Sequence, residues 1–147
     1  MSDFFRERLS IRNDRTGDIV GTVWGLNRKK ADLDGDFIMT RQEGFRRLAK
    51  DKDLTGTDRR VLDIYFANLD FENYILISQQ VIADDLEIKR EQVSRSTKKL
   101  IEKGILIQGE KIGRHYCFRL NPFYGWKGKT DKEFKEFYEQ YAKQTEA

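Results

Sequence analysis

"IADDLEIKREQVSRSTKKLIEKGIL", residues 82–106, repeats apolar side chains at helical spacing among many lysines and arginines. A first helix, "QQVIADDL", is predicted to begin after an N-cap at Ser78. A second helix, "EQVSRSTKKLIEKG", follows the link "EIKR" and is predicted to stop at Gly104. Ala83 is small, which suits a close helix crossing. The apolar residues expected to fix the crossing angle are Val81, Ile82, Leu86, Ile88, Val93 and Leu100.

The order helix, tight turn, helix is typical of a helix-turn-helix, whose second helix lies in the major groove of DNA. In this chain the apolar side of the second helix is expected to hold Val93, Thr97, Leu100 and Ile101. Arginine can bind guanine with two hydrogen bonds, and glutamine can do the same with adenine. Lysines more often contact phosphates, which position the protein without reading sequence. The residues predicted to face DNA are Arg90, Glu91, Gln92, Ser94, Arg95, Lys98 and Lys99, with Ser94 and Ser96 small enough for close approach.

The turn between these helices departs from the usual pattern. Many such turns have a glycine after the first helix, but this chain has Glu87 there. Because a side chain disfavours a left-handed backbone, we expect a turn that is strained or slightly altered.

A β-hairpin is predicted directly after the second helix. The runs "ILIQ" and "HYCFRL" are strand-like, and the polar turn "GEKIGR" separates them. Lys111 and Arg114 flank the tip, and cations there suit the DNA backbone or minor groove. The fold class predicted for the chain is therefore α+β, a winged helix-turn-helix with an N-terminal β-hairpin and a C-terminal helix.

The first part of the chain has weaker signals. Residues 1–17 are expected to form an arm or a short helix. "DIVGTVWGL" and "ADLDGDFIM" predict a β-hairpin with its turn at Asp34-Gly35. Thr40 with Glu43 forms a capping-box pattern before one helix, and Thr57 is the expected N-cap of the next. The apolar stripe of that next helix is Val61, Leu62, Tyr65, Phe66 and Leu69.

A last helix is predicted from Thr130 to Gln144. Its aromatic residues recur at helical spacing and must be covered by something. Packing on the same chain is one solution, and we favour pairing with a second copy, because a two-fold protein can read a repeated site. The stripe consists of Phe134, Phe137, Tyr138 and Tyr141. The predicted organisation is an arm at 1–17, the DNA-binding domain at 18–129 and a dimerising helix at 130–147.

Composition limits the function classes. The segment from Glu87 to Lys129 has eleven Lys or Arg and four Glu, a net charge of +7 in a chain whose total is +3. Such a basic segment is a typical footprint of a nucleic-acid partner, although a solvated face is the simpler explanation. With one cysteine and one histidine, a Cys/His zinc site is excluded within one chain. No cofactor, metal or membrane span is expected, and we predict a cytoplasmic protein.

The run "VSRSTKKLIEKGILI" followed by "YCFRLNPFYGWKGK" resembles the RepL-type plasmid replication proteins. The resemblance covers about Asp36 to Lys129. It rests mainly on Asn121-Pro122 and on Trp126-Lys127-Gly128, since helix-turn-helix motifs are shared by many regulators. It implies a DNA-binding protein that starts or maintains plasmid replication by binding an origin site and recruiting host replication proteins.

Several other functions remain open on the sequence. The first alternative is a winged-helix transcriptional regulator with the same DNA contacts. A second is an interaction module whose winged helix contacts only protein. An enzyme that nicks DNA through a tyrosine is the least favoured, because it needs a cluster of metal ligands that a chain with one histidine does not suggest. We therefore expect a non-enzymatic protein.

Overall fold

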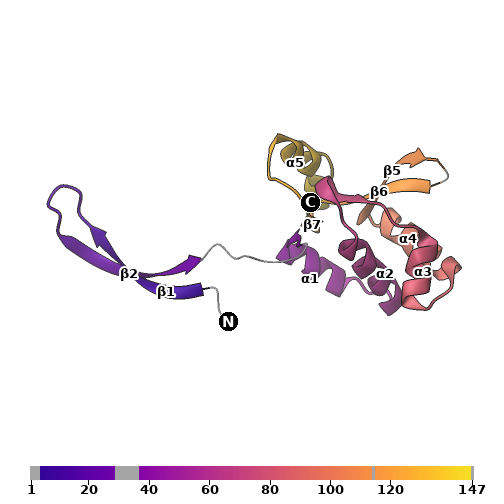
Figure 1. Cartoon of the computed structure of the whole chain (residues 1–147), viewed down its shortest axis with the longest axis horizontal. Coiled ribbons are helices and arrows are strands. Elements are labelled where there is room, and N and C mark those ends of the chain that lie inside the picture. The colour runs from indigo at the N-terminus through magenta and orange to yellow at the C-terminus, as the bar shows by residue number, and fades with distance from the viewer. Residues whose placement is uncertain (1–3, 29–36, 114, 147) are drawn as a thin grey trace. The chain divides into compact units, whose positions relative to one another are not determined.

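The computed structural model describes residues 4–28, 37–113 and 115–146 and shows a mixed α+β chain (Figure 1). It divides into two compact units, Met1–Asp36 and Phe37–Ala147. The first unit is a two-stranded antiparallel ribbon of β1 (Phe4–Arg12) and β2 (Ile19–Arg28). The second unit contains all the helices that the structure describes.

The ribbon corrects the prediction for the N-terminal residues. Residues 4–12 form a strand, not an arm or a helix, and this strand is the partner of β2. The reason is a turn signal in "NDRTGD": the Asn13 N–H donates to the Asp18 carbonyl (2.8 Å), and Gly17 adopts a φ of 73°. Asn13 Oδ1 also accepts from the Arg15 N–H at 2.9 Å, as asparagine commonly does in turns. The turn expected at Asp34-Gly35 lies outside the described residues.

The second unit alternates short strands with helices. The bounds of its elements are β3 (Met39–Thr40), α1 (Gln42–Lys50), α2 (Gly56–Ala67), η1 (Phe71–Asn73), β4 (Tyr74–Ile75), α3 (Gln79–Leu86), α4 (Arg90–Glu102), β5 (Leu106–Ile112), β6 (His115–Leu120), β7 (Gly125–Trp126), α5 (Lys132–Phe137), η2 (Tyr138–Ala142) and α6 (Lys143–Glu146). A three-stranded sheet has the order β4-β6-β5, and β3 pairs separately with β7. The β5–β6 pairing starts at Leu106 opposite Leu120 and has an irregularity between Gln108 and Lys111.

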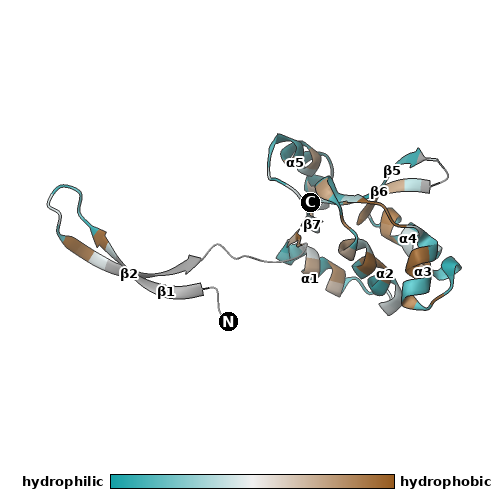
Figure 2. Cartoon of the chain, in the orientation of Figure 1, coloured by the Kyte–Doolittle hydropathy of each residue, from teal (hydrophilic) through white to brown (hydrophobic). Residues whose placement is uncertain are grey.

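Helix α2 lies at the centre of the core. The stripe predicted for it is confirmed, since Val61, Leu62 and Tyr65 have no exposed surface and Leu69 is also buried. These residues pack with side chains of α3, α4, β5 and β6 in one apolar cluster. In Figure 2 the helices of this unit alternate brown and teal along their length, as amphipathic helices do.

The N-caps predicted for α1 and α2 are both wrong in position. Helix α2 begins after Thr55, not Thr57: the Asp58 N–H donates to Thr55 Oγ1 (3.1 Å), and the Thr55 N–H donates to Asp58 Oδ2 (2.9 Å). Thr40 belongs to β3, and α1 follows Arg41 without a side-chain cap. The reciprocal bonds of Thr55 and Asp58 satisfy two N–H groups, which is why this earlier start is preferred.

Asn73 joins three segments that are far apart in sequence. Its side chain is fully buried, and its φ of 66° is one that asparagine adopts more readily than most residues. Its Nδ2 donates to the carbonyls of Leu120 (3.0 Å) and Gly125 (2.7 Å), and its Oδ1 accepts from the Lys127 N–H (2.9 Å). One amide therefore ties η1 to the end of β6 and to β7.

The C-terminal helical run packs on its own chain. Helical residues extend from Lys132 to Glu146, close to the predicted range. The rings of Phe134 and Phe137 lie 4.9 and 6.1 Å from that of Trp126, and the Arg119 guanidinium lies 3.6 Å from the Phe137 ring centre. Phe137 is only 6% exposed, whereas Phe134, Tyr138 and Tyr141 are half-buried, so the stripe packs in part on its own chain. Pairing with a second copy stays a prediction.

Replacing Asn73 with glycine tests the amide's role. Glycine keeps the positive φ accessible but removes all three hydrogen bonds. We expect the free energy of unfolding to fall by about 2–4 kcal/mol, because buried backbone groups lose their partners. Urea unfolding followed by circular dichroism measures it. Asn68→Ala, which removes an exposed hydrogen bond to the Ile64 carbonyl, should lower the free energy of unfolding by less than about 1 kcal/mol. Equal losses of stability in the two variants would contradict the role given to the Asn73 amide.

Candidate nucleic-acid interface

Helices α3 and α4 are joined by a turn that has a left-handed residue. Ser78 caps α3 as predicted, accepting from the Val81 N–H at 3.2 Å. Glu87 ends α3 with a φ of 54°, and the Ile88 N–H then donates to the Ala83 carbonyl at 3.1 Å. The turn therefore has the geometry for which glycine is usual, and the expected strain falls on Glu87 at about 1 kcal/mol or slightly more.

The contact between the two helices is apolar. Ile82 and Ala83 of α3 and Val93 and Leu100 of α4 are buried, as predicted. Val81 does not belong to this set, since 47% of it is exposed. The guanidinium of Arg60, from α2, donates to the carbonyl of Leu86 at 3.2 Å and so caps the end of α3.

The outward face of α4 is exposed over its first three turns. Arg90, Glu91, Gln92, Ser94, Arg95 and Lys98 are all solvent-exposed. Gln92 Oε1 accepts from the Lys89 N–H at 3.1 Å and caps the helix, so it is partly engaged before any base arrives. Arg95 donates through Nε to the Glu91 carbonyl at 3.4 Å, and its two terminal nitrogens form no hydrogen bond with the described residues. Within the described part of the chain, the side chains of Arg90 and Lys98 form no hydrogen bond or ion pair.

Two residues expected on the DNA-facing side point into the protein. Ser96 is 3% exposed and donates to Asp58 Oδ1 at 2.6 Å. Lys99 places Nζ 2.7 Å from Asp58 Oδ2 and 3.0 Å from the Asp53 carbonyl oxygen. The prediction that Lys99 contacts phosphate is therefore not supported by its position, because its ammonium is already bound.

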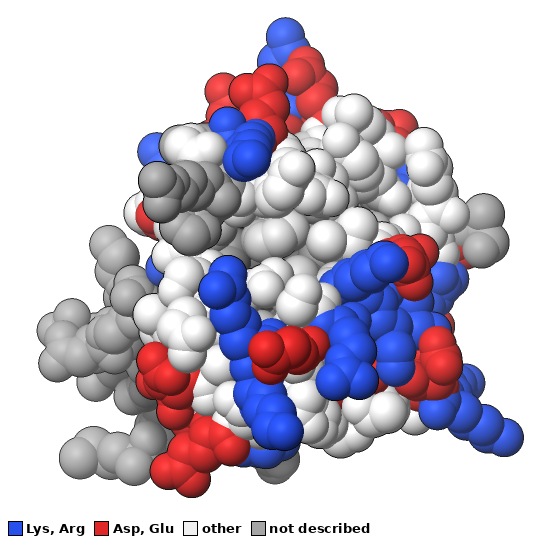
Figure 3. All heavy atoms as spheres, turned by 90° about the vertical axis from the view of Figure 1, so that its right-hand side faces the viewer, with Lys and Arg blue, Asp and Glu red and all other residues white. Residues whose placement is uncertain are grey.

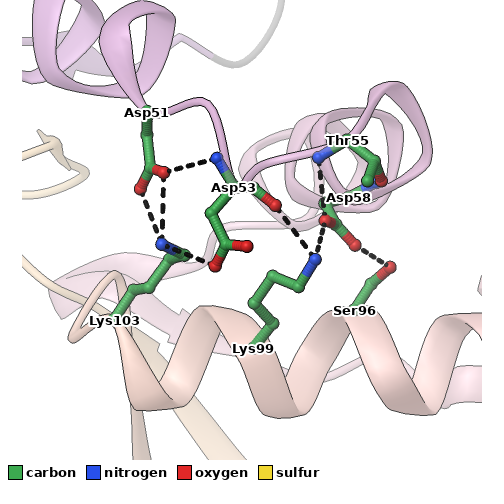
Figure 4. A network of polar contacts seen from close by, with 7 residues as sticks. All are labelled: Asp51, Asp53, Thr55, Asp58, Ser96, Lys99 and Lys103. Atoms are coloured by element: carbon green, nitrogen blue, oxygen red, sulfur yellow. Dashed lines mark hydrogen bonds and ion pairs between the residues drawn. The ribbon is translucent and has the colours of Figure 1, made fainter.

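Asp58 is the centre of a polar network between α2 and α4 (Figure 4). Its carboxylate accepts from Ser96, Lys99 and the Thr55 N–H, and its side chain is 6% exposed. Burial by itself raises the pKa of Asp58, but the hydrogen bonds from Lys99, Ser96 and Thr55 outweigh it and lower the pKa from 3.8 to about 2. The hydrogen bond to Asp58 in turn raises the pKa of Lys99. Asp58 is thus ionised at neutral pH.

A second ion pair lies one turn further along α4. Lys103 Nζ is 2.9 Å from Asp51 Oδ2 and 3.1 Å from Asp53 Oδ2 (Figure 4). The hydrogen bond from Lys103 lowers the pKa of Asp51, and the bonds to Asp51 and Asp53 raise the pKa of Lys103. Lys99 and Lys103 together hold the loop before α2 against one side of α4. Spacing in the sequence did not reveal this, because the acidic partners are about forty to fifty residues away.

Lys111 is the described cation toward the tip of the β5–β6 hairpin, whereas Arg119 of β6 is bound to the Glu72 carbonyl at its base. Lys111 is exposed and lies in β5, where its Nζ is 5.8 Å from the ring centre of Tyr116 on β6. Arg114 lies outside the described residues. Cys117 is 8% exposed and is a free thiol. Figure 3 shows lysines and arginines gathered on the side of the molecule at the right of Figure 1, with acidic residues among them.

Comparisons with protein-family models, with curated proteins and with solved structures found no match. Over residues 4–28, 37–113 and 115–146, no group of three or more His, Cys, Asp and Glu side chains is arranged to hold a metal ion. None of the helices in these ranges is both long and apolar enough to cross a membrane.

Replacing Asp58 with asparagine should destabilise the protein. The change removes the ion pair with Lys99 and leaves Ser96 and the cap with a weaker acceptor. We expect the free energy of unfolding at pH 7 to fall by about 2–3 kcal/mol, measured by urea unfolding. Asp63→Asn is the matched control, since this exposed carboxylate of α2 pairs only loosely with Arg59 at 3.5 Å, and its loss should cost less than about 0.5 kcal/mol.

The low pKa of Asp58 also predicts a pH dependence. The carboxylate has a pKa of about 2 in the folded chain against an ordinary value of 3.8, so the folded state favours the ionised form. This contribution of about 2 kcal/mol is fully present above about pH 5 and is lost as the pH falls toward the folded pKa. Stability curves from pH 7 to pH 2 should fall less steeply in Asp58→Asn than in the parent. Parallel curves would show that Asp58 does not carry this dependence.

Proposed function

We propose that this chain is a winged helix-turn-helix protein that binds double-stranded DNA in a sequence-specific manner. Helix α4 would enter the major groove, and the β5–β6 hairpin would be the wing beside it. The order α3, turn, α4, hairpin supports this reading, as does the burial of the apolar side of α4. A helix that reads DNA needs one face fixed to the protein and the other open, and α4 meets both conditions.

The observation that carries the proposal is that the lysines and arginines of α4 lie on two different sides of the helix, one bound and one exposed. Lys99 and Lys103 are bound to carboxylates on the inner side, whereas Arg90, Arg95 and Lys98 are exposed on the outer side. A helix whose charged face merely met water would not require its inner lysines to be fixed by ion pairs to Asp58 and Asp51. The fixed side sets the direction of the open side, so that its arginines are presented to a groove in one orientation.

The biological role that we propose follows from the resemblance to RepL-type proteins. The chain would bind an origin site and recruit host replication proteins, without catalysing a reaction itself. A homodimer through the C-terminal helical run, on a repeated or palindromic site, remains part of the proposal. A transcriptional regulator would use the same interface, and the genomic position of the target separates the two.

The decisive experiment is selection from a pool of random duplex DNA, with sequencing of the retained molecules at two salt concentrations. An enriched motif would establish specific recognition, and its location in an origin or a promoter would separate initiator from regulator. Retention without a motif would reduce the interface to non-specific electrostatics. If no DNA were retained at either salt concentration, the proposal would be wrong.

Substitutions on α4 should separate reading from anchoring. Arg95→Ala is expected to weaken binding to the selected site by about 1–3 kcal/mol and to relax the preference at one base position. Lys98→Ala should weaken binding to all sequences alike and reduce the salt slope by about 1. Lys132→Ala on α5 removes the same charge from a side chain that is 88% exposed, and it should change neither quantity. Fluorescence anisotropy titrations measure the DNA affinity of all three variants. Identical affinities and salt slopes for Lys98→Ala and Lys132→Ala would contradict the proposal that α4 contacts DNA.

A further inference from the structure

The outer face of the β4-β6-β5 sheet forms the floor of a cleft. Tyr74 of β4 and Ile107 of β5 are both register partners of Arg119 of β6, so the three side chains share one face. Phe118, the neighbouring residue of β6, belongs to the core, so this face points away from the core. Cys117, two positions before Arg119, is on the same face and also lines the cleft. The cleft has a volume of about 500 Å³, within the range of about 300–1,000 Å³ that is usual for small-molecule sites.

Aromatic side chains from the C-terminal helical run also line the cleft. They are Phe137 and Tyr141, whose ring centres lie 5.1 Å apart at an interplanar angle of 68°. Phe137 is buried, whereas Tyr141 is half-buried, so part of the Tyr141 side chain is open to a ligand. Ile107, which is also half-buried, adds aliphatic surface from the floor. Apolar walls of this kind suit a flat ring, because the bound ring removes apolar surface from water.

Arg119 brings a positive charge to the floor of the cleft. Its Nε and Nη2 both donate to the Glu72 carbonyl, at 3.0 and 2.7 Å, and its guanidinium lies 4.4 and 3.6 Å from the ring centres of Tyr74 and Phe137. These contacts fix the guanidinium in one orientation.

The third nitrogen of this guanidinium has no partner within the chain. Among the described residues, no carboxylate pairs with Arg119, and its Nη1 forms no hydrogen bond. Every buried side-chain nitrogen or oxygen of these residues has a hydrogen-bond partner, so the unbonded Nη1 reaches solvent. A half-buried cation that is held only by rings and a neutral carbonyl is complementary to an anion.

We propose that this cleft binds a small aromatic carboxylate, with the ring against Tyr141 and Ile107 and the carboxylate accepting from Nη1 of Arg119. An inorganic anion would match the charge but would leave the apolar walls in water. Glu110 also lines the cleft and opposes an anion, but its side chain is exposed, so solvent and salt screen its charge. This site does not depend on the proposed DNA-binding function, and either proposal can fail without the other.

The test compares two ligands of the same shape and different charge. The full-length protein is titrated by calorimetry with 2-naphthoate and with 2-naphthamide, its neutral analogue. Because a hydrogen bond to a charged group contributes about 1.5–3 kcal/mol, the carboxylate should bind about tenfold to a hundredfold more tightly than the amide. Equal affinities, tighter binding of the amide, or no binding of either ligand would overturn the proposal.

Substitution of Arg119 tests the assigned contact. In Arg119→Gln the preference for 2-naphthoate should disappear, while the affinity for 2-naphthamide, which reports that the cleft is still formed, should stay near that of the parent. Lys132→Gln is the matched control, since it removes the same charge from a side chain that is 88% exposed and does not line the cleft. It should keep the preference of the parent. The same preference in Arg119→Gln and Lys132→Gln would overturn the contact with Arg119.

Cys117 locates the ligand in the unmodified protein, so this measurement does not depend on how a variant folds. It is the one cysteine of the chain, and its alkylation by iodoacetamide is followed by mass spectrometry. A ligand that covers the floor of the cleft, present at ten times its Kd, should slow alkylation about tenfold by mass action. If saturating 2-naphthoate left the alkylation rate unchanged, the ligand would be bound elsewhere and the proposal would be wrong.

Discussion

The buried carboxylate of Asp58 joins the start of α2 to the middle of α4, and the direction of α4 depends on it. The same carboxylate closes the capping box with Thr55, so one group both begins α2 and receives Lys99 and Ser96. A buried charge is costly unless it is paired and fully hydrogen-bonded. Here every side-chain polar atom that is buried in the described residues has a partner, so the network fixes geometry without leaving an unsatisfied group.

Because of this anchoring, the cations of α4 and its C-cap fall into two groups, those bound to carboxylates and those exposed to solvent. Lys99 and Lys103 neutralise acids of the loop before α2, and their positive charge is largely cancelled there. Arg90, Arg95 and Lys98 stay on the outer side, and the acidic residues of the helix itself are Glu91 and Glu102. The charge that α4 leaves exposed is therefore smaller than its composition suggests, and if α4 binds DNA as proposed, cations beyond it would add to the affinity. Lys111 on the hairpin is such a cation.

The buried amide of Asn73 has a related role where η1 meets β6 and β7. It holds η1 against the ends of β6 and β7, and Arg119 adds a second tie by donating to the Glu72 carbonyl through Nε and Nη2, at 3.0 and 2.7 Å. The Arg119 guanidinium lies over the rings of Tyr74 and Phe137, which connects this hub to the C-terminal helical run. The strands that continue into the β5–β6 hairpin thus start from a rigid base, while the tip of the hairpin extends away from it.

The sequence by itself determined the order of the elements from α2 to the β5–β6 hairpin, the C-terminal helix, the apolar stripe of α2, the Ser78 cap and the exposed residues at the start of α4. It did not reveal β7, which pairs with β3. These follow from local periodicity and turn chemistry, which act over a few residues. Only the tertiary structure decided that Ser96 and Lys99 face inward, that Thr55 replaces Thr57 as the cap, and that Phe134 and Phe137 pack on Trp126. It also decided that β1 is the partner of β2. Each of these depends on a partner that local spacing does not identify, because the free energy of a buried ion pair, a ring contact or a strand pairing is set by residues brought together only when the chain folds.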